Sequence, residues 1–410
     1  MKKHISLFLR KFRPAHLLTA LFLGFLFFVG AAAIPTFLTN TSDYLQTSFD
    51  LGGYIRKINQ QYSSMLETEN ELPLLQDKGS YIDLNGLMAN LLGQPMMNDR
   101  VTLKNGHLDS PQSDAPDPEE IRNAADNIIR FRDVHADNGG DFLFVVVPRQ
   151  LSKYEDLLPT GYSDTNNDTA DTFLSLLDAA EVPFLDLREE MHKDGMTMSD
   201  AYYVTDHHWK PQTGLWAYGK ILEKLQKMGA VEAVNPLYTD PNSYTFEIYE
   251  DTFLGSSGKR TGRYYAGLDD SILLKPNFET EISLSIPQRK LEVTGSYENV
   301  AYNTEAVHNY NDPDLYNENV YGLYGWGDTA ISHWRNEDAP LQQKFLLIGD
   351  SFGNIPFSLM SLCASSCDEV DMRHFQENFQ EYYDSFQPDT VVILIGVSSI
   401  NTEFTDSYLN

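Results

Sequence analysis

The order of apolar and polar positions predicts helices and strands in alternation. Apolar residues recur every three or four positions over residues 118–136, which predicts a helix with one buried side. Residues 142–147 are continuously apolar and lie between a glycine pair and a proline. Such a run is typical of a strand that is buried on both faces of a parallel sheet.

The same alternation recurs to the end of the chain. Further helices are expected at residues 168–181, 211–228, through Cys363, and 376–386, and further strands at residues 182–187, 344–348, 369–372 and 390–395. This order predicts an α/β domain with a mainly parallel sheet flanked by helices. Between them, residues 230–340 are polar and rich in Tyr and Asn, with short alternating runs such as residues 282–286. We interpret this region as a β-rich insertion.

The N-terminus predicts a membrane anchor. Residues 15–38 contain no charged side chain and follow five basic residues, Lys2, Lys3, Arg10, Lys11 and Arg13. The run exceeds the roughly 20 residues that a helix needs to cross a bilayer, and the basic flank should stay in the cytoplasm. Ala31, Ala32 and Ala33 also offer the small residues of a signal-peptidase site, so cleavage and secretion stay open. The rest of the chain is expected outside the cytoplasm.

Charge and cysteine content exclude several classes of protein. The chain carries 59 acidic and 30 basic residues, a formal charge of −29. This excess repels phosphate backbones, so no nucleic-acid partner is expected. Cys363 and Cys367 are too few for a disulfide scaffold or a cysteine-rich zinc site, and we expect two small buried residues on one helix. No metal or cofactor is predicted.

A serine follows one of the predicted strands. The strand at 344–348 runs into Gly349, Asp350 and Ser351, and an apolar helix is expected next. The hydroxyl would therefore lie at the carboxyl end of a parallel strand, beside backbone N–H groups that can bind an oxyanion. The same residue types also serve as turns and helix caps. The α/β-hydrolase elbow is rejected because its histidine follows the serine at a distance, and only His374 follows Ser351.

A second cluster could supply the base that a serine nucleophile needs. Asp206, His207, His208 and Trp209 directly precede Pro211, which is expected to open a helix. Asp206 could bond one ring nitrogen of His208 while the other faces the serine. Two other interpretations stay open: metal ligation by Asp206, His207 and His208, and a turn or helix cap formed by Asp206.

Together these motifs resemble a known family. Gly349-Asp350-Ser351 is similar to the first block of SGNH hydrolases, and residues 205–211, Thr-Asp-His-His-Trp-Lys-Pro, resemble the signature of the DHHW proteins. DHHW proteins are extracytoplasmic relatives of the alginate O-acetylation proteins. The resemblance extends over about residues 140–410, with further similar segments at 253–256, Gly262 and 388–396. It implies an SGNH-like fold that transfers or hydrolyses acyl groups, usually acetyl.

The resemblance also implies roles for individual residues. Ser351 would be the nucleophile, His208 the base and Asp206 its orienting partner. Where SGNH hydrolases often carry Gly-x-Asn-Asp, this chain has Gly-Val-Ser-Ser at residues 396–399, so the usual oxyanion-binding asparagine is absent. Asn354 and Ser398 are the substitutes we expect beside the Ser351 N–H group.

The insertion offers a possible substrate surface. Its aromatic residues are interleaved with Asn and Asp, which suits sugar rings, and Tyr321, Tyr324 and Trp326 are the candidate contacts. The alternative is that these rings fill a small sheet.

For the whole chain we expect a cytoplasmic tail and anchor at residues 1–38, a spacer with N-terminal helices at 39–139, and an SGNH-like catalytic domain at 140–410.

The expected activity is serine-dependent transfer of an acyl group, most simply acetyl, to a cell-envelope or exported polysaccharide. Such a transferase would need a membrane-bound partner that exports acyl groups. The alternatives are a carbohydrate esterase of the same fold, which needs no such partner, and a non-catalytic protein that binds or assembles glycans.

Overall fold

The computed structural model describes residues 78–400 together with Gly24. The predicted anchor at residues 15–38 and the spacer up to residue 77 lie outside this part, apart from that glycine. Within the described residues, none of the helices combines the length and apolar character that a membrane span requires.

The central sheet of the described chain has eight strands in the order β5-β4-β13-β11-β12-β10-β8-β9. The first five are mutually parallel and the last three are antiparallel to their neighbours. We call β10, β8 and β9 the antiparallel wing. The strands are β4 (Asp141–Val147), β5 (Phe184–Asp186), β8 (Ile282–Ile286), β9 (Leu291–Gly295), β10 (Ile331–Arg335), β11 (Leu341–Gly349), β12 (Ala364–Val370) and β13 (Thr390–Gly396).

The sheet is therefore mixed, whereas the sequence predicted a mainly parallel one. The three extra strands come from the segment between α9 and β11, and their alternating pattern gives no sign of which sheet they join. β8 has the alternation of buried and half-buried residues expected at 282–286.

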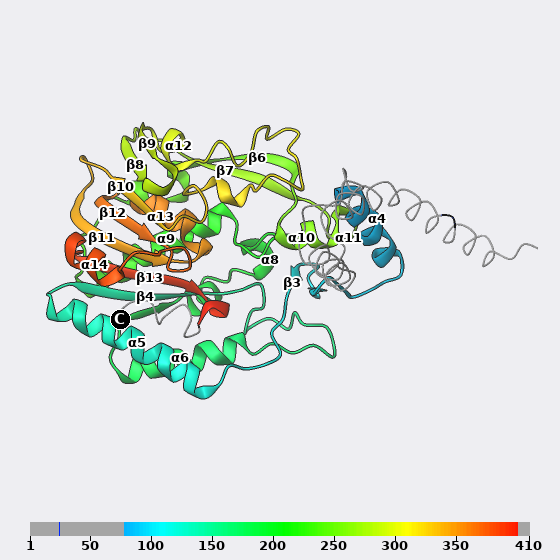
Figure 1. Ribbon diagram of the computed structural model, residues 1–410, viewed down its shortest axis with the longest axis horizontal. Helices are drawn as coiled ribbons and strands as arrows, with labels where there is room; N and C mark the ends of the chain where they lie inside the picture. The colour runs from blue at the N-terminus through cyan, green and yellow to red at the C-terminus, as the bar shows by residue number, and fades with distance from the viewer. Residues whose placement is uncertain (1–23, 25–77, 401–410) are drawn as a thin grey trace, which may run out of the picture. The chain divides into compact units, whose positions relative to one another are not determined.

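Helices cover both faces of the parallel strands (Figure 1). α5 (Pro118–Asp137), α6 (Asn166–Ala179) and α14 (Phe379–Phe386) pack on one face, and α9 (Pro211–Met228) and α13 (Asn354–Met360) pack on the other. Proline opens both α5 and α9, where its missing N–H costs no hydrogen bond. α9 ends at Gly229, whose φ of 79° suits glycine.

The predicted helix through Cys363 is wrong. α13 ends at Met360, Cys363 lies in the following turn, and Cys367 lies on β12, which starts earlier than the strand expected at residues 369–372. Almost all residues of α13, the following turn and β12 are buried. The sequence therefore shows neither a helical nor a strand period that could locate the boundary between helix and strand. Both cysteines are buried and unbridged.

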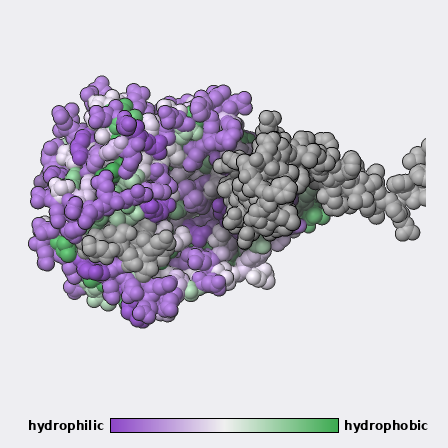
Figure 2. Space-filling view, in the orientation of Figure 1, coloured by the Kyte–Doolittle hydropathy of each residue, from purple (hydrophilic) through white to green (hydrophobic). Residues whose placement is uncertain are grey.

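Smaller elements complete the described chain. Two short sheets are formed by β1 (Met96–Met97), β2 (Arg100–Thr102) and β3 (Leu108–Asp109), and by β6 (Tyr244–Phe253) and β7 (Asp269–Pro276). The remaining α-helices are α4 (Lys78–Leu91), α7 (Leu187–Lys193), α8 (Met198–Ala201), α10 (Ser256–Thr261), α11 (Arg263–Ala266) and α12 (Tyr297–Ala301). The visible face of the described residues is largely hydrophilic, in keeping with the acidic composition (Figure 2).

Candidate active site

Ser351 lies where the sequence predicted, at the carboxyl end of a parallel strand. β11 ends at Gly349, and Ser351 opens a short 3-10 turn, Ser351–Gly353, that leads into α13. A Cβ atom on Gly349 would lie 2.7 Å from the Phe357 ring and 2.9 Å from the Leu394 carbonyl oxygen. Position 349 therefore requires glycine, because β13 and α13 leave no room for a side chain at the end of β11.

Asp350 ties this turn to the neighbouring strand. Its carboxylate accepts hydrogen bonds from the Phe352 N–H (3.1 Å), the Gly396 N–H (2.9 Å) and the Ser399 hydroxyl (2.9 Å). Burial raises the pKa of Asp350 above its ordinary value, and these neutral donors only partly oppose the rise. Asp350 thus fastens the ends of β11 and β13 together beneath Ser351.

The histidine that faces Ser351 lies on an irregular loop. A bridge between Tyr202 and Trp209 closes this loop, and α9 begins directly after it. His208 Nδ1 lies 2.5 Å from Asp206 Oδ1, and His208 Nε2 lies 2.7 Å from Ser351 Oγ. The structure therefore brings Asp206, His208 and Ser351 into one hydrogen-bonded series.

Asp206 is held in place from both sides. Its Oδ1 accepts the His208 backbone N–H at 3.0 Å, and its Oδ2 accepts the Ser256 N–H at 2.7 Å. Gly255 leaves room for this contact, since a Cβ there would lie 2.3 Å from the Asp206 Cβ. Burial alone would favour the neutral acid, but His208 and the Ser256 amide hold the pKa of Asp206 well below its ordinary value. The carboxylate stays ionised and favours a proton on Nδ1.

Other buried polar groups support the histidine loop. Asp269 accepts hydrogen bonds from the Val204 N–H, the Thr205 N–H and the Thr205 hydroxyl, while Gln150 donates to the carbonyl oxygens of Tyr203 and Asp206. The sequence analysis singled out neither Asp269 nor Gln150. Gln150 follows the carboxyl end of β4, so the rule that drew attention to Ser351 could have found it. No local pattern marks Asp269.

The three candidate aromatic residues occupy different surroundings. Tyr321 is 3% exposed and stacks on His208, with ring centres 3.8 Å apart and an angle of 7°. Tyr324 is buried, and its hydroxyl donates to the Ile272 carbonyl oxygen. Trp326 is half-buried and donates to the Val300 carbonyl oxygen. Tyr321 therefore touches the site, whereas Tyr324 and Trp326 contribute to the packing of the insertion.

The two candidate oxyanion residues differ in burial. Asn354 opens α13 and is 3% exposed. Ser398 lines a hollow of about 410 Å³ together with His207 and Phe352. Arg100, Arg149 and Asp109 line the same hollow, and Arg149 forms an ion pair with Asp109.

The metal interpretation of this loop fits less well. Asp206, His207 and His208 do present ligand atoms within 4.8 Å of one another. However, both ring nitrogens of His208 are already engaged, one by Asp206 and one by Ser351. The same donors thus form a hydrogen-bonded series suited to proton transfer.

A second acidic group lies beside the sheet. Asp328, Asp371 and His374 also present ligand atoms within 4.8 Å of one another. Arg373 contacts Asp371 at 2.5 Å and Asp328 at 3.4 Å, and so already supplies positive charge there.

Comparisons with known proteins agree with this geometry. A family model described as an SGNH hydrolase-like domain, acetyltransferase AlgX, matches residues 107–239. The comparison with curated proteins found no match. Bacillus cereus PatB1, solved with a sulfonyl adduct, has a similar fold with a TM-score of 0.62 and 17% identity, over 76% of this chain and 100% of that one.

A second solved structure with a similar fold is a DHHW family protein. A DHHW family protein from Eubacterium siraeum matches with a TM-score of 0.56 and 16% identity, over 77% of this chain and 97% of that one. At these identities the structures show a shared fold. The chain therefore has an SGNH-hydrolase-like α/β fold, and its resemblance to the DHHW proteins and their AlgX-type relatives is confirmed.

Proposed function

We propose that this protein is an extracytoplasmic acyltransferase that moves an acetyl group through Ser351 to a hydroxyl of a cell-envelope or exported polysaccharide. The observation that carries the proposal is the series Asp206 Oδ1, His208 Nδ1, His208 Nε2 and Ser351 Oγ, with contacts of 2.5 and 2.7 Å. The similarity to an acetyltransferase family model supports the acyl group, and the resemblance to alginate O-acetylation proteins supports the glycan acceptor.

In the first half of the reaction, Ser351 acquires the acyl group. His208 Nε2 accepts the proton of the Ser351 hydroxyl while Oγ attacks the carbonyl carbon of a donor ester. Asp206 stabilises the imidazolium that forms. The tetrahedral intermediate then expels the donor's alcohol, which takes the proton from His208, and the ester remains on Ser351.

In the second half, the acceptor hydroxyl gives its proton to His208 and attacks the ester carbon. Collapse of this intermediate breaks the bond to Ser351 Oγ, which recovers its proton from His208. The Ser351 N–H group, with Ser398 or Asn354, is proposed to bind the oxyanion in both halves. Water in place of the acceptor would make the same site an esterase.

The proposal includes a location and a partner. An anchor at residues 15–38 would hold the domain outside the cytoplasm, because basic residues precede the apolar run. Acetyl groups originate in the cytoplasm, so a membrane-bound acyl exporter would have to supply the donor. A deacetylating enzyme would need no such partner.

The test follows the acyl group directly. The full chain is incubated with p-nitrophenyl acetate, with and without oligosaccharide acceptors, and its intact mass and products are measured. We expect an acetyl adduct that Ser351→Ala abolishes and that Ser285→Ala, a serine on the antiparallel wing, leaves unchanged. Acetylated sugar would identify a transferase and free acetate an esterase. A folded chain with neither adduct nor turnover would contradict both and favour a glycan-binding protein.

A further inference from the structure

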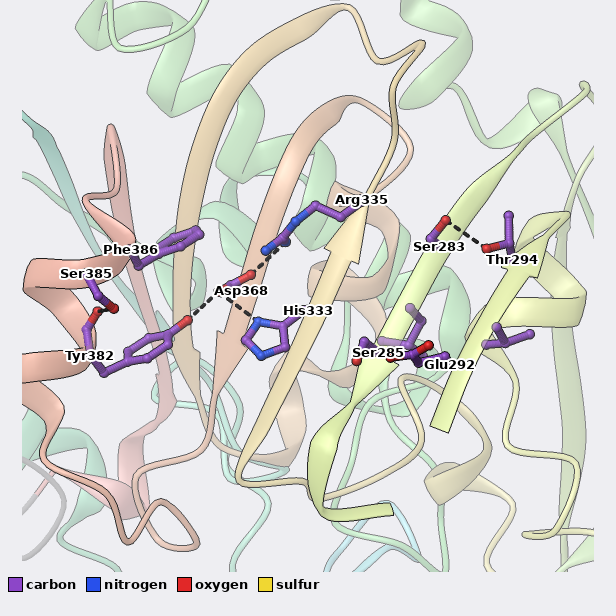
Figure 3. A pocket seen from close by; sticks show the side chains of 12 residues that line it. Ser283, Ser285, Glu292, Thr294, His333, Arg335, Asp368, Tyr382, Ser385 and Phe386 are labelled. Carbon is purple, nitrogen blue, oxygen red and sulfur yellow. Dashed lines mark hydrogen bonds and ion pairs between the residues drawn. The ribbon is translucent and has the colours of Figure 1, made fainter. Parts of the chain in front are cut away.

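A second hollow, of about 810 Å³, lies over the antiparallel wing (Figure 3). Its lining residues include neither Ser351 nor the residues of the histidine loop. We call it the wing hollow. Strands β8, β9, β10 and β12 form its floor, and α14 forms one wall. The lining side chains used below are Ser283, Ser285, Glu292, His333, Arg335 and Asp368.

The hollow exists because helices cover only part of this face of the sheet. Along β8, Ile282, Leu284 and Ile286 are buried in the core on one side, whereas Ser283 and Ser285 are half-buried on the other. α5, α6 and α14 pack over the parallel strands on the serine side. The wing thus presents a polar face at the edge of α14, as antiparallel sheets commonly do.

Charged groups fix the floor of the hollow. Asp368 is only 2% exposed and accepts a 2.7 Å hydrogen bond from Arg335 and a short one from the Tyr382 hydroxyl. His333 Nδ1 lies 2.9 Å from Asp368 Oδ2, the oxygen that also accepts from Tyr382. Figure 3 shows these three side chains converging on Asp368 from β10 and α14. Ordering this cluster in advance lowers the entropy cost of binding a ligand.

Hydroxyl and carboxylate groups continue across the strands. Ser285 pairs in register with His333 on one side and with Glu292 on the other, and Ser283 Oγ lies 2.9 Å from Thr294 Oγ1. Residues that face one another across strands lie about 5 Å apart on the same face. A ligand along this row would meet alternating donors and acceptors.

Two rings form the wall beside this row. Tyr382 and Phe386 of α14 are half-buried and stack with ring centres 6.1 Å apart and an angle of 9°. The lining side chains carry one guanidinium, of Arg335, against the two carboxylates of Glu292 and Asp368. Hydroxyl partners beside aromatic rings suit a polyhydroxylated ligand, and the excess negative charge disfavours an anionic one.

We propose that the wing hollow binds a segment of a neutral glycan chain. Asp368 pairs with Leu346 on β11, and Ser351 follows Leu346 by five residues, which span at most about 17 Å at ~3.3 Å per residue. A polymer can occupy both places at once, whereas a single sugar cannot. That this glycan is the acyl acceptor rests on the proposed function. That the hollow binds a glycan does not depend on it.

The first experiment measures binding without turnover. The full chain with Ser351→Ala is applied to an array of neutral and uronate-containing oligosaccharides, and the affinity of the best neutral ligand is measured by calorimetry. Glu292→Ala removes an exposed carboxylate of the hollow, and Ser285→Trp fills it. The matched controls are Glu250→Ala and Ser175→Trp, at exposed positions that do not line the hollow.

We expect both hollow variants to weaken binding of the neutral glycan at least tenfold and both controls to leave it unchanged. Glu292→Ala alone decides the matter if Ser285→Trp fails to fold, since Glu292 is exposed. The proposal is overturned if the array shows no bound neutral glycan, or if the hollow variants bind as the parent does.

A second experiment separates this inference from the proposed function. Acetylation of Ser351 by p-nitrophenyl acetate is measured in the parent chain without glycan, beside glycan binding by the Ser351→Ala chain. A chain that binds glycan through the hollow but never forms acyl-Ser351 would support the wing site and contradict the proposed reaction. A chain that acetylates Ser351 but binds no neutral glycan would do the reverse.

Discussion

Two regions of one sheet contain the same three residue types in different geometry. At the carboxyl edge of the parallel strands, Asp206, His208 and Ser351 form one hydrogen-bonded series. Across the antiparallel wing, His333 lies between Asp368 and Ser285 in strand register. There the acid contacts Arg335 and Tyr382 as well as the imidazole, and the described residues include no hydrogen bond from His333 to the serine.

The difference shows that position decides what such residues can do. A strand end followed by a turn frees a serine to meet a histidine from another loop, and it places backbone N–H groups nearby. In the middle of a sheet, the backbone groups pair with neighbouring strands and the side chains stand in parallel rows. The first arrangement suits proton transfer, and the second suits a binding surface.

The largest expected effect comes from replacing the serine of each region by alanine. Ser351→Ala should reduce acyl transfer at least 10³-fold, because among the described residues Ser351 Oγ is the hydroxyl that contacts His208 Nε2. Ser285→Ala should leave the rate of Ser351 acetylation without glycan within about twofold, because this half-buried hydroxyl lies away from the chemistry. Initial rates with p-nitrophenyl acetate test both. Equal loss in the two variants would remove the distinction between the regions.

The next effect compares the two aspartates. Asp206→Asn should reduce the rate by about 10²–10⁴-fold, because an amide neither stabilises the imidazolium nor fixes the same tautomer. Asp368→Asn should leave it within about twofold. The rate at several pH values and the circular dichroism of each variant would be recorded. A normal rate in folded Asp206→Asn would show that His208 does not need its acid.

The third effect concerns stability rather than rate, and it is expected at Asp368. His333, Arg335 and Tyr382 outweigh burial and lower the pKa of Asp368 below its ordinary 3.8. Its contribution is therefore present above about pH 4 and is lost as the pH falls through the lowered value. Asp368→Asn should cost about 1–3 kcal/mol at pH 7 and flatten this acid dependence. Urea unfolding from pH 3 to 7 measures both, and parallel curves for parent and variant would contradict the assignment.

The smallest effect concerns the hydroxyls beside each acid. Ser399→Ala removes a donor from buried Asp350 and should cost about 1–2 kcal/mol, whereas Ser283→Ala on the wing should cost below about 0.5. The pKa of Asp350 is already raised, so stability falls as the pH rises from 3.8 through the raised value. Ser399→Ala should extend this fall to higher pH. Thermal unfolding at pH 5 and 7 compares the two variants, and the same pH dependence in both would be the contrary result.

The sequence predicted best where the signals are local. α9 runs from Pro211 to Met228 as expected, because a proline marks its start and a left-handed glycine its end. Ser351, Asp206 and His208 were found because each lies in a short motif beside an element boundary. Their proximity was predicted, and their roles in a reaction stay a prediction.

Long-range pairing explains what the sequence did not predict. Asp269 bonds the backbone at Val204 and Thr205 from a distant strand, and only the folded chain places it there. Likewise, His333 has no acid beside it in the sequence, and Asp368 reaches it from another strand. The join between β10 and β12 escaped prediction for the same reason, and so did the boundary near Cys363, where burial on every side removes the period.

The place of β13 in the sheet bears on how the chain folds. β13 spans Thr390–Gly396 yet lies between β4 and β11, and β4 begins at Asp141. The centre of the sheet thus cannot close until the last described strand has emerged from the ribosome. Contacts of such wide sequence separation slow folding, and they leave apolar strand edges exposed meanwhile. A chain truncated before Thr390 should bind chaperones or aggregate, even though it retains the whole histidine loop.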